Sequence, residues 1–374
     1  MSKLPLTVKI PCYLLSLVLG VIILIYSKEF LLPMVLAALL SLLLYPLFKK
    51  LTKWKVPTIL AVFLTMLVVV VVVVGTAIII SKEIGMVVTD IVSSGGKIND
   101  KIVALHNFIA LHFHVDDATI TNWLSSLKDK LIGNAGNVAS GALATTGSFM
   151  SSLALVIVYV FCFLLYNRSF HDFAYALMGD ERQSETSTII GHIQKLVQHY
   201  LLGLLTVIFI IGTLNSIGLF IIGVDHALFF AFFAAMLTII PYIGIFLGAS
   251  LPVLYVLLTR DSIWPAAGVF GIFLTVQFLE SNFITPKIVG SRVSVNPFVA
   301  IVALLIGGEI WGIPGMLLSI PLTAVLKLLL DTRPKTKAIG YFLGSELTDT
   351  KNDPFKFFGK KKVEPSPPPK KKKE

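Results

Sequence analysis

Carboxylate and amide side chains inside apolar runs are the residues of this sequence that could do chemistry. Gln277, Glu280 and Asn282 occur together in QFLESN, and Glu309 occurs in IGGEIWGIPG. A charge placed inside a membrane helix costs roughly 2.5–3.5 kcal/mol on insertion scales, so such residues are functional candidates by default. A carboxylate at that depth can carry a proton or bind a cation. The sequence therefore makes Glu309, followed by Glu280, the first candidates for an ion or substrate pathway.

The composition indicates a membrane protein. Of the 374 residues, 56% are hydrophobic and 14% are charged, whereas soluble proteins average about 25% charged residues. Residues 57–80 contain no charge at all, and this run is longer than the roughly 20 residues that cross a bilayer. Several other runs approach that length. They predict an all-α polytopic fold of about eight membrane segments, some of them broken or re-entrant half-helices.

The alternation of apolar and polar segments predicts the order of elements along the chain. The predicted order is three transmembrane helices in 1–80, an extracytoplasmic insert of amphipathic helices in 81–142, a transmembrane helix in 143–166, a cytoplasmic polar and helical segment in 167–198, a transmembrane core in 199–332, and a basic, largely disordered tail in 333–374. The first apolar run lacks a small-residue cleavage site, so it is predicted to be a retained helix and not a signal peptide.

Lysine and arginine residues define the predicted orientation. Lys3 and Lys9 precede the first span, and residues 49–56 contain four lysines. The positive-inside rule therefore places the N-terminus and this loop in the cytoplasm. Following the segments in order puts 24 of the 31 basic residues, including those of the C-terminal tail, on the cytoplasmic side. The net charge of +10 is concentrated in the tail, which favours contact with anionic lipid and argues against nucleic acid.

A helix break is predicted within residues 226–259. These 34 residues would extend about 51 Å as one straight helix, too long for a single span. The segment PYIGIFLGASLP at 241–252 supplies the break. Pro241 lacks a backbone donor, and Gly244 with Gly248 permits close helix packing. The sequence leaves open whether the two halves form two short spans or one re-entrant loop.

A second break predicts a hairpin near the end of the core. Residues 296–310 and 315–330 are each about 22 Å long as helices, which is short for a crossing. Between them lies GGEIWGIPG at 307–315, which contains Gly308 and Pro314. Two half-helices that enter the membrane and return explain this pattern, with Glu309 at the tip. Lys287 and Arg292 mark a cytoplasmic turn just before the hairpin.

Several candidates also have a purely structural interpretation. Asn215, inside a predicted span, could bond to a neighbouring helix or contact a ligand. Glu280 could form an ion pair with Lys287 or Arg292 instead of carrying an ion. The segment HFHVDD at 112–117 could bind a metal, although a solvated loop before a capped helix explains the same residues.

Three blocks of the C-terminal half resemble the autoinducer-2 exporter family of bacterial inner-membrane proteins. They are PYIG at 241–244, ESNFITPKIVG at 280–290 and NPFVAIVALLIGGEIWGIPGMLLSIP at 296–321. With the early spans and the helical insert, the resemblance covers most of the chain. It implies a multi-spanning, transporter-like protein that can self-associate. It also implies a link to export of the autoinducer-2 signal or, in some members, to exchange of sodium or lithium for protons.

Motifs of ATP-driven pumps and metalloenzymes are absent from the sequence. It contains neither GxxxxGKS or GxxxxGKT nor HExxH, so no enzyme activity, cofactor or metal is expected. The leading hypothesis is a secondary transporter that exports a small hydrophilic molecule such as autoinducer-2. The alternatives are a sodium or lithium/proton antiporter and a passive channel or membrane scaffold. The expected partners are that substrate, a monovalent cation or proton, lipid, and further copies of the chain.

The predicted depth of Glu309 leads to a first testable outcome. Glu309→Gln should abolish transport, because the amide can neither release a proton nor neutralise a cation. Membrane insertion should be unchanged. Flux into proteoliposomes at equal protein abundance measures the effect, and a wild-type rate for the variant would contradict the assignment.

Overall fold

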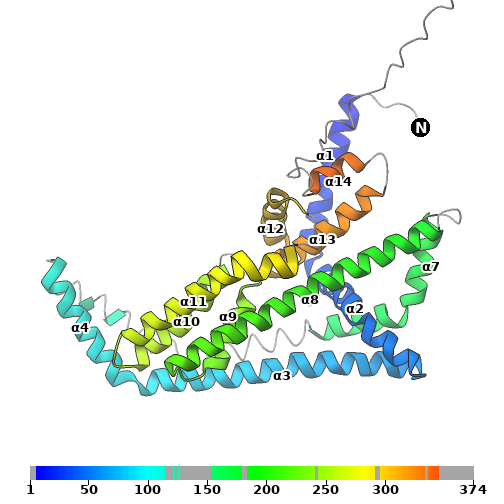
Figure 1. Ribbon diagram of the computed structural model, residues 1–374. Helices are drawn as coiled ribbons and strands as arrows, with labels where there is room; N and C mark the ends of the chain where they lie inside the picture. Colours follow the sequence, from blue (N-terminus) through cyan, green and yellow to red (C-terminus); the bar gives the residue numbers. More distant parts are fainter. Residues whose placement is uncertain are drawn as a thin grey trace, which may run out of the picture.

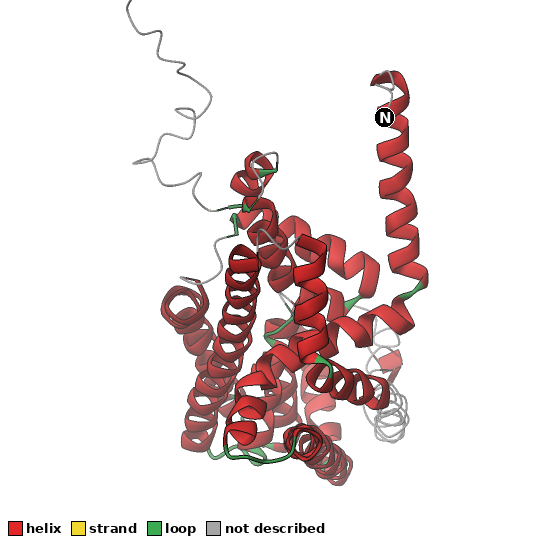
Figure 2. Ribbon diagram, turned by 90° about the vertical axis from the view of Figure 1, so that its right-hand side faces the viewer, coloured by secondary structure: helices red, strands yellow, loops and turns green. Residues whose placement is uncertain are grey.

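The protein is helical throughout the part of the chain that its computed structural model describes. That part comprises residues 6–113, 121–122, 125–126, 153–178, 183–240, 243–290, 295–332 and 336–344. Within these ranges the one β-type contact is an isolated antiparallel bridge between Val295 and Gly344. Figure 2 shows helices in almost every segment drawn in colour. The predicted all-α fold is confirmed.

Five helices are long and apolar enough to cross a membrane. They are α2 (Lys28–Lys53), α3 (Thr58–Ser93), α8 (Gln183–Ile222), α11 (Trp264–Leu279) with the π-helical turns that continue it, and α13 (Ile313–Asp331). Residues 153–165 and the start of α7 (Asn167–Met178) form a further apolar pair bent by 67°. The chain is therefore a multi-pass membrane protein, as its composition predicts.

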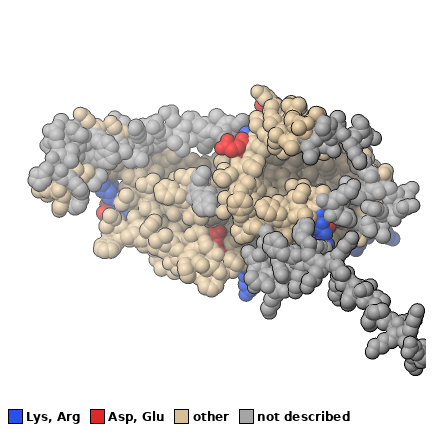
Figure 3. Space-filling model, turned by 90° about the horizontal axis from the view of Figure 1, so that it is seen from above, with Lys and Arg blue, Asp and Glu red and all other residues tan. Residues whose placement is uncertain are grey.

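The remaining helices are shorter or less apolar. They are α1 (Leu6–Tyr26), α4 (Gly95–Phe113), α9 (Ala227–Leu237), α10 (Ile243–Thr259), α12 (Pro297–Trp311) and α14 (Lys337–Leu343). Figure 1 shows α8, α9, α10 and α11 side by side above α3, whereas α1 stands apart from this group. Charged side chains are sparse on the face seen in Figure 3, which is expected of a surface that contacts lipid.

Helix α3 joins two separately packed parts of the molecule. Its first turns, including Ala61, Val62 and Met66, pack against α2 and against residues 153–165. Near its other end, Val87 and Ile91 pack against the core formed by α8, α9, α10 and α11. This single helix therefore contacts both packed groups.

The helix α3 also extends beyond its predicted end. Its 36 residues are about 54 Å long, well over the roughly 30 Å of a hydrocarbon core. The predicted boundary at residue 80 is therefore not a helix end, since α3 continues to Ser93. The mixed polarity after residue 80, where Lys82 and Glu83 lie, led to the prediction of a separate insert, but neither residue breaks a helix. The predicted amphipathic helix of the insert begins at Gly95 as α4, and residues 114–120 and 127–142 lie outside the described ranges.

A break is present within residues 226–259, but it is shorter than the predicted segment 241–252: α9 ends at Leu237 and α10 begins at Ile243, with Pro252 inside α10. The two helices touch through small residues. A Cβ added at Gly244 would overlap the carbonyl oxygen of Leu237. One added at Gly248 would lie 3.0 Å from the Cβ of Ala234. The close helix approach predicted from Gly244 and Gly248 is confirmed, while Pro241 lies outside the described residues.

The hairpin formed by α12 and α13 turns at one residue. Gly312 has a φ of +67°, a conformation that glycine adopts at no steric cost. The predicted break at 307–315 is thus narrower than expected. Pro314 lies in the first turn of α13, where its missing N–H is harmless, so this helix begins before Gly315. The 19 residues of α13 meet the length of a full crossing, unlike the predicted half-helix.

The helix α11 continues into the segment that was predicted to form a cytoplasmic turn. It continues as two π-helical turns, η3 (Glu280–Ile284) and η4 (Pro286–Gly290). Lys287 therefore lies in a helical segment and not in the predicted turn. Wider π-helical turns can include Pro286, whose ring removes a backbone donor from a regular helix.

Close packing within the hairpin leads to a prediction about stability. A methyl group added at Gly307 would overlap Ser319 Oγ and lie 2.6 Å from the Gly315 carbonyl oxygen. Gly307→Ala should lower the free energy of unfolding by about 1–3 kcal/mol. Gly271→Ala is the matched control, because nothing lies within 4 Å of its added methyl. That variant should be neutral or stabilising by up to about 1 kcal/mol.

Thermal unfolding in detergent measures both changes. Equal melting temperatures for Gly307→Ala and Gly271→Ala would show that the α12–α13 contact is looser than described.

Candidate functional site

A cavity with about 60 Å³ of open space lies among α8, α9, α10 and α11. Its lining residues come from all four helices: Ile211, Asn215, Ala234, Thr238, Gly244, Ile245, Gly248, Ala249, Phe270, Phe273, Leu274, Val276 and Gln277. Ten of these are apolar or glycine, and three carry polar side chains. An apolar cleft with a few polar groups is typical of a small-molecule site.

Asn215 contributes an unsatisfied polar group to this cavity. The residue is only 2% exposed, and its amide oxygen is buried without a hydrogen bond to any described residue. Leaving such a group unpaired costs about 1–3 kcal/mol. Asn215 lies seven residues before the end of α8, or about 10 Å along the helix. An acceptor at that depth is available to a ligand.

The two other polar side chains have local partners but keep free capacity. The Gln277 amide donates to Ser281 Oγ at 3.1 Å, and the Thr238 hydroxyl donates to the Ala235 carbonyl at 2.7 Å. A primary amide has two N–H groups and a carbonyl oxygen, and a hydroxyl can still accept. The cavity therefore offers both donors and acceptors.

Glu280 lies one helical turn beyond Gln277, on the same face of the helix. Its carboxyl group is near the side chains of Gln277 and Thr285. Its Oε2 and the Thr285 hydroxyl are nevertheless buried without a good hydrogen bond to any described residue. Glu280 also begins the π-helical segment η3, and π-helical turns occur frequently at functional sites.

The alternative ion pair of Glu280 with Lys287 is not formed. Lys287 is exposed, and no salt bridge joins it to Glu280 in the described part of the chain. Arg292 lies outside the described residues. The pairing that gave Glu280 a purely structural role therefore lacks one of its two predicted partners.

The structure groups some predicted site residues and separates others. Asn215, Gln277 and Gly244 line one cavity, and Glu280 is next to it. Asn282 is exposed and donates to the Phe278 carbonyl of its own helix at 2.9 Å. Pro241 is not among the described residues.

The hairpin residues lie elsewhere, near the junction of α1 and α2. Glu309 is exposed, and a methyl group added at Gly308 would meet the side chain of Met316. Trp311 is buried and donates to the Leu24 carbonyl at 3.0 Å. Glu309, Gly308 and Pro314 do not line the cavity, so their role in a pathway stays a prediction.

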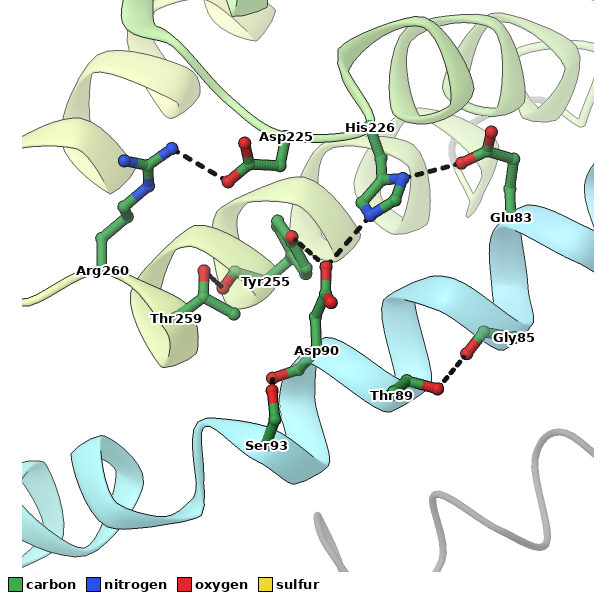
Figure 4. A network of polar contacts seen from close by, with 10 residues as sticks. All are labelled: Glu83, Gly85, Thr89, Asp90, Ser93, Asp225, His226, Tyr255, Thr259 and Arg260. Carbon is green, nitrogen blue, oxygen red and sulfur yellow. Dashed lines mark hydrogen bonds and ion pairs between the residues drawn. The ribbon is translucent and has the colours of Figure 1, made fainter.

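A polar network at the far end of α3 was not predicted from the sequence (Figure 4). The His226 ring contacts Glu83 through Nδ1 at 2.8 Å and Asp90 through Nε2 at 3.0 Å. The Tyr255 hydroxyl donates to the same Asp90 oxygen at 2.9 Å. Glu83 and Asp90 are seven residues apart, which places them on one face of a helix. This spacing is the feature of the sequence from which a shared face of the two carboxylates could have been predicted.

The network and the cavity lie on opposite sides of one apolar core. Tyr255 and Phe230 belong to this core, and their rings are 5.0 Å apart. Ala234 and Phe273 belong to the same core and also line the cavity. Along the bundle, the order is thus polar network, apolar layer, cavity and then Glu280.

Metal ligands do not converge anywhere in the described ranges. No group of three or more His, Cys, Asp or Glu side chains there could hold a metal ion. Of the segment 112–117, only residues 112 and 113 are described.

Comparison with known proteins adds a family and several relatives. The family described as AI-2E family transporter matches residues 14–335. YueF of Bacillus subtilis strain 168 is 28% identical over 313 residues, covering 79% of this chain and 82% of YueF. TqsA of Escherichia coli K12, named "AI-2 transport protein", is 25% identical over 319 residues, covering 85% of this chain and 90% of TqsA.

A third relative matches over a shorter stretch. YrrI of Bacillus subtilis strain 168 is 34% identical over 144 residues, and the match covers 38% of this chain. The aligned part spans only 40% of the length of YrrI. YrrI and YueF both carry the name "Putative transport protein".

The unpaired amide of Asn215 leads to a prediction that separates function from packing. Asn215→Leu keeps the branched shape and the four heavy atoms of the side chain and removes a buried polar group. The free energy of unfolding should therefore rise by up to about 1–3 kcal/mol or stay equal. Thermal unfolding in detergent measures this. A marked fall in melting temperature would mean that the amide already has a structural partner, and the cavity would lose its ligand acceptor.

Proposed function

Because the chain belongs to the AI-2E family of transporters, we propose that it is a secondary transporter that exports a small hydrophilic molecule such as autoinducer-2. The observation that carries this proposal is the cavity among α8, α9, α10 and α11 with the unpaired amide oxygen of Asn215 in its wall. A ligand that donates a hydrogen bond to this buried oxygen removes the free-energy cost of leaving it unpaired. The site therefore favours ligands that carry a hydroxyl or amide group. The proposal is transport and not catalysis.

The chemistry of the cavity fits a neutral or polar molecule of small size. Its open space of about 60 Å³ is well below the roughly 300–1,000 Å³ of pockets that hold drug-sized ligands, so only a very small molecule fits without movement of the helices. The amides of Asn215 and Gln277 and the hydroxyl of Thr238 can each accept or donate hydrogen bonds. Ring faces of Phe270 and Phe273 complete the wall, which suits a compact ligand with both polar and apolar edges.

A second function, exchange of sodium or lithium for protons, is supported by Glu280. Its buried carboxyl oxygen has no good hydrogen bond to any described residue, and carboxylates at membrane depth mark proton and ion pathways. The π-helical turns that begin at Glu280 also change the direction of nearby carbonyl groups, which can bind cations at helix irregularities. In an exporter, the same carboxylate would couple substrate movement to protons.

For its location we propose the bacterial inner membrane, with both termini in the cytoplasm. The distribution of basic residues supports this orientation, since residues 49–56 and the tail are rich in lysine. The large exposed apolar side chains of α1, among them Tyr13, Leu14 and Leu17, fit contact with lipid or with a second copy of the chain. Self-association is part of the proposal.

Transport against a gradient distinguishes these functions from a passive channel. Purified protein in proteoliposomes should accumulate autoinducer-2, sodium or lithium above the outside concentration when a proton gradient is imposed. Each solute is measured in a separate assay. Flux that only equalises concentrations would indicate a channel. If none of the three solutes crosses the membrane, the result would favour a scaffold that does not transport.

Glu280→Gln is predicted to remove the coupling to protons. The loss of one charged contact of about 1.5–3 kcal/mol corresponds to a fall of about ten- to hundredfold in the rate of uphill transport. Asp172→Asn is the matched control, because this carboxylate on α7 is exposed, and it should transport at the wild-type rate. An unchanged dependence of flux on pH in Glu280→Gln would rule out Glu280 as the proton carrier.

A further inference from the structure

The imidazole of His226 bridges two carboxylates that belong to another helix. Both ring nitrogens are engaged, Nδ1 with Glu83 and Nε2 with Asp90, as Figure 4 shows. A neutral imidazole has one N–H, whereas an imidazolium has two. Because both partners are acceptors, both contacts are satisfied together only when His226 carries a second proton.

The bridge lies where α3 meets the four-helix core. His226 occupies the turn between α8 and α9 in a left-handed conformation, with a φ of +59°, and its carbonyl accepts the Phe230 N–H of α9 at 3.0 Å. Asp90 also accepts from Tyr255 of α10. The carboxylates of α3 are therefore held by two elements of the core, next to the apolar contacts of Val87 and Ile91.

Five titratable or charged groups surround the imidazole. They are Glu83 and Asp90 from α3, Asp225 from its own turn, Tyr255 from α10 and Arg260 from the turn after α10. Arg260 pairs with Asp225 at 2.9 Å and donates to the Gly223 carbonyl. Arg260 and Asp225 neutralise each other. The positive charge that pairs with Glu83 and Asp90 of α3 is therefore that of protonated His226.

Loss of the second proton changes the contact from attractive to repulsive. Partial burial lowers the pKa of His226, but hydrogen bonds and charges from Asp90 and Glu83 outweigh it, so the pKa is raised above 6.5. The bridge is complete below pH 6.5 and is lost as the pH rises through that raised pKa. One carboxylate of α3 then faces a nitrogen lone pair without a donor.

A second set of polar contacts joins α4 to the same end of the core. Lys97 of α4 pairs with Asp261 at 3.1 Å, and Lys101 donates to the carbonyl groups of Leu257 and Arg260. Burial lowers the pKa of Lys101, but none of these contacts involves the imidazole of His226. Asp261 is therefore a suitable position for a control variant, because it contacts α4 near the bridge but does not contact His226.

We propose that His226 is a proton-binding site that holds the end of α3 against α9 and α10 when protonated and releases it when neutral. The ligand of this site is a proton, and binding of the proton changes how tightly α3 packs on the core. On the predicted orientation the site faces the outside of the cell, so external pH controls how α3 packs on the apolar core that separates this site from the cavity. This last step rests on the proposed function, whereas the proton site itself does not.

The test follows the accessibility of α3 as a function of pH in the full-length protein. Ile91→Cys reports the contact, because Ile91 packs against the core. Thr89→Cys is its reference, because Thr89 is exposed on the same helix and corrects for thiolate ionisation. Both are made in a background without Cys12 and Cys162, and maleimide labelling rates are measured in nanodiscs from pH 5 to pH 9.

The expected result is a single transition in the ratio of the two labelling rates. The ratio should rise with pH through one midpoint above pH 6.5. In His226→Gln the transition should be absent, with the ratio at its high value throughout. Asp90→Asn should move the midpoint down by about one to three pH units, because an opposite charge stabilises the imidazolium by that amount. Asp261→Asn should leave the midpoint unchanged.

Two results would overturn the proposal. One is a constant ratio in the wild-type background across the whole pH range, and the other is an unchanged transition in His226→Gln. If His226→Gln does not fold, an unmoved midpoint in Asp90→Asn decides against the site. A normal transition in a protein that transports no solute would remove the proposed function and leave the proton site standing.

Discussion

The need to pair every backbone N–H and C=O inside a bilayer is the constraint on which this structure depends. Helices meet it along their length, which is why the described part of the chain is almost wholly helical. Irregular backbone is tolerated at membrane depth only where protein or a cavity surrounds it. The gap between α9 and α10, the π-helical turns after Leu279 and the turn at Gly312 all occur in the second half of the chain. Two of the three adjoin the cavity or Glu280.

Length arithmetic predicts much of the architecture because membrane thickness limits helix length. It correctly separates α9 from α10 and α12 from α13, and small residues correctly mark the close contact at Gly244. The predicted helix boundaries are wrong where a residue type is compatible with both the interior and the end of a helix. Charges after Ile80 are compatible with a helix that leaves the membrane, and Pro314 starts a helix as readily as it ends one. Pro286 is included in a widened turn, so α11 is longer than its apolar run.

The candidate site is only partly predictable. Asn215, Gln277 and Glu280 stand out because each is polar in an apolar run, and the packing of α8 against α11 brings them near one another. Glu309 stands out for the same reason but lies exposed beside a different part of the fold. Sequence position cannot distinguish the two cases, since it does not say which helix faces will meet. The contacts of Asp90 with His226 and Tyr255 span 136 and 165 residues of sequence, so spacing alone does not reveal them.

The length and continuity of α3 have a mechanical consequence. A helix of about 54 Å that is packed against one group of helices near its start and against another near its end behaves as a lever arm. Rotation by about 10° around its first turns displaces its far end by about 9 Å, a distance close to one helix diameter. A change of one proton at His226 is small in energy, but it acts on Glu83 and Asp90 near the far end of this helix. Small angular freedom between the two groups is thus converted into a large displacement beside the four-helix core.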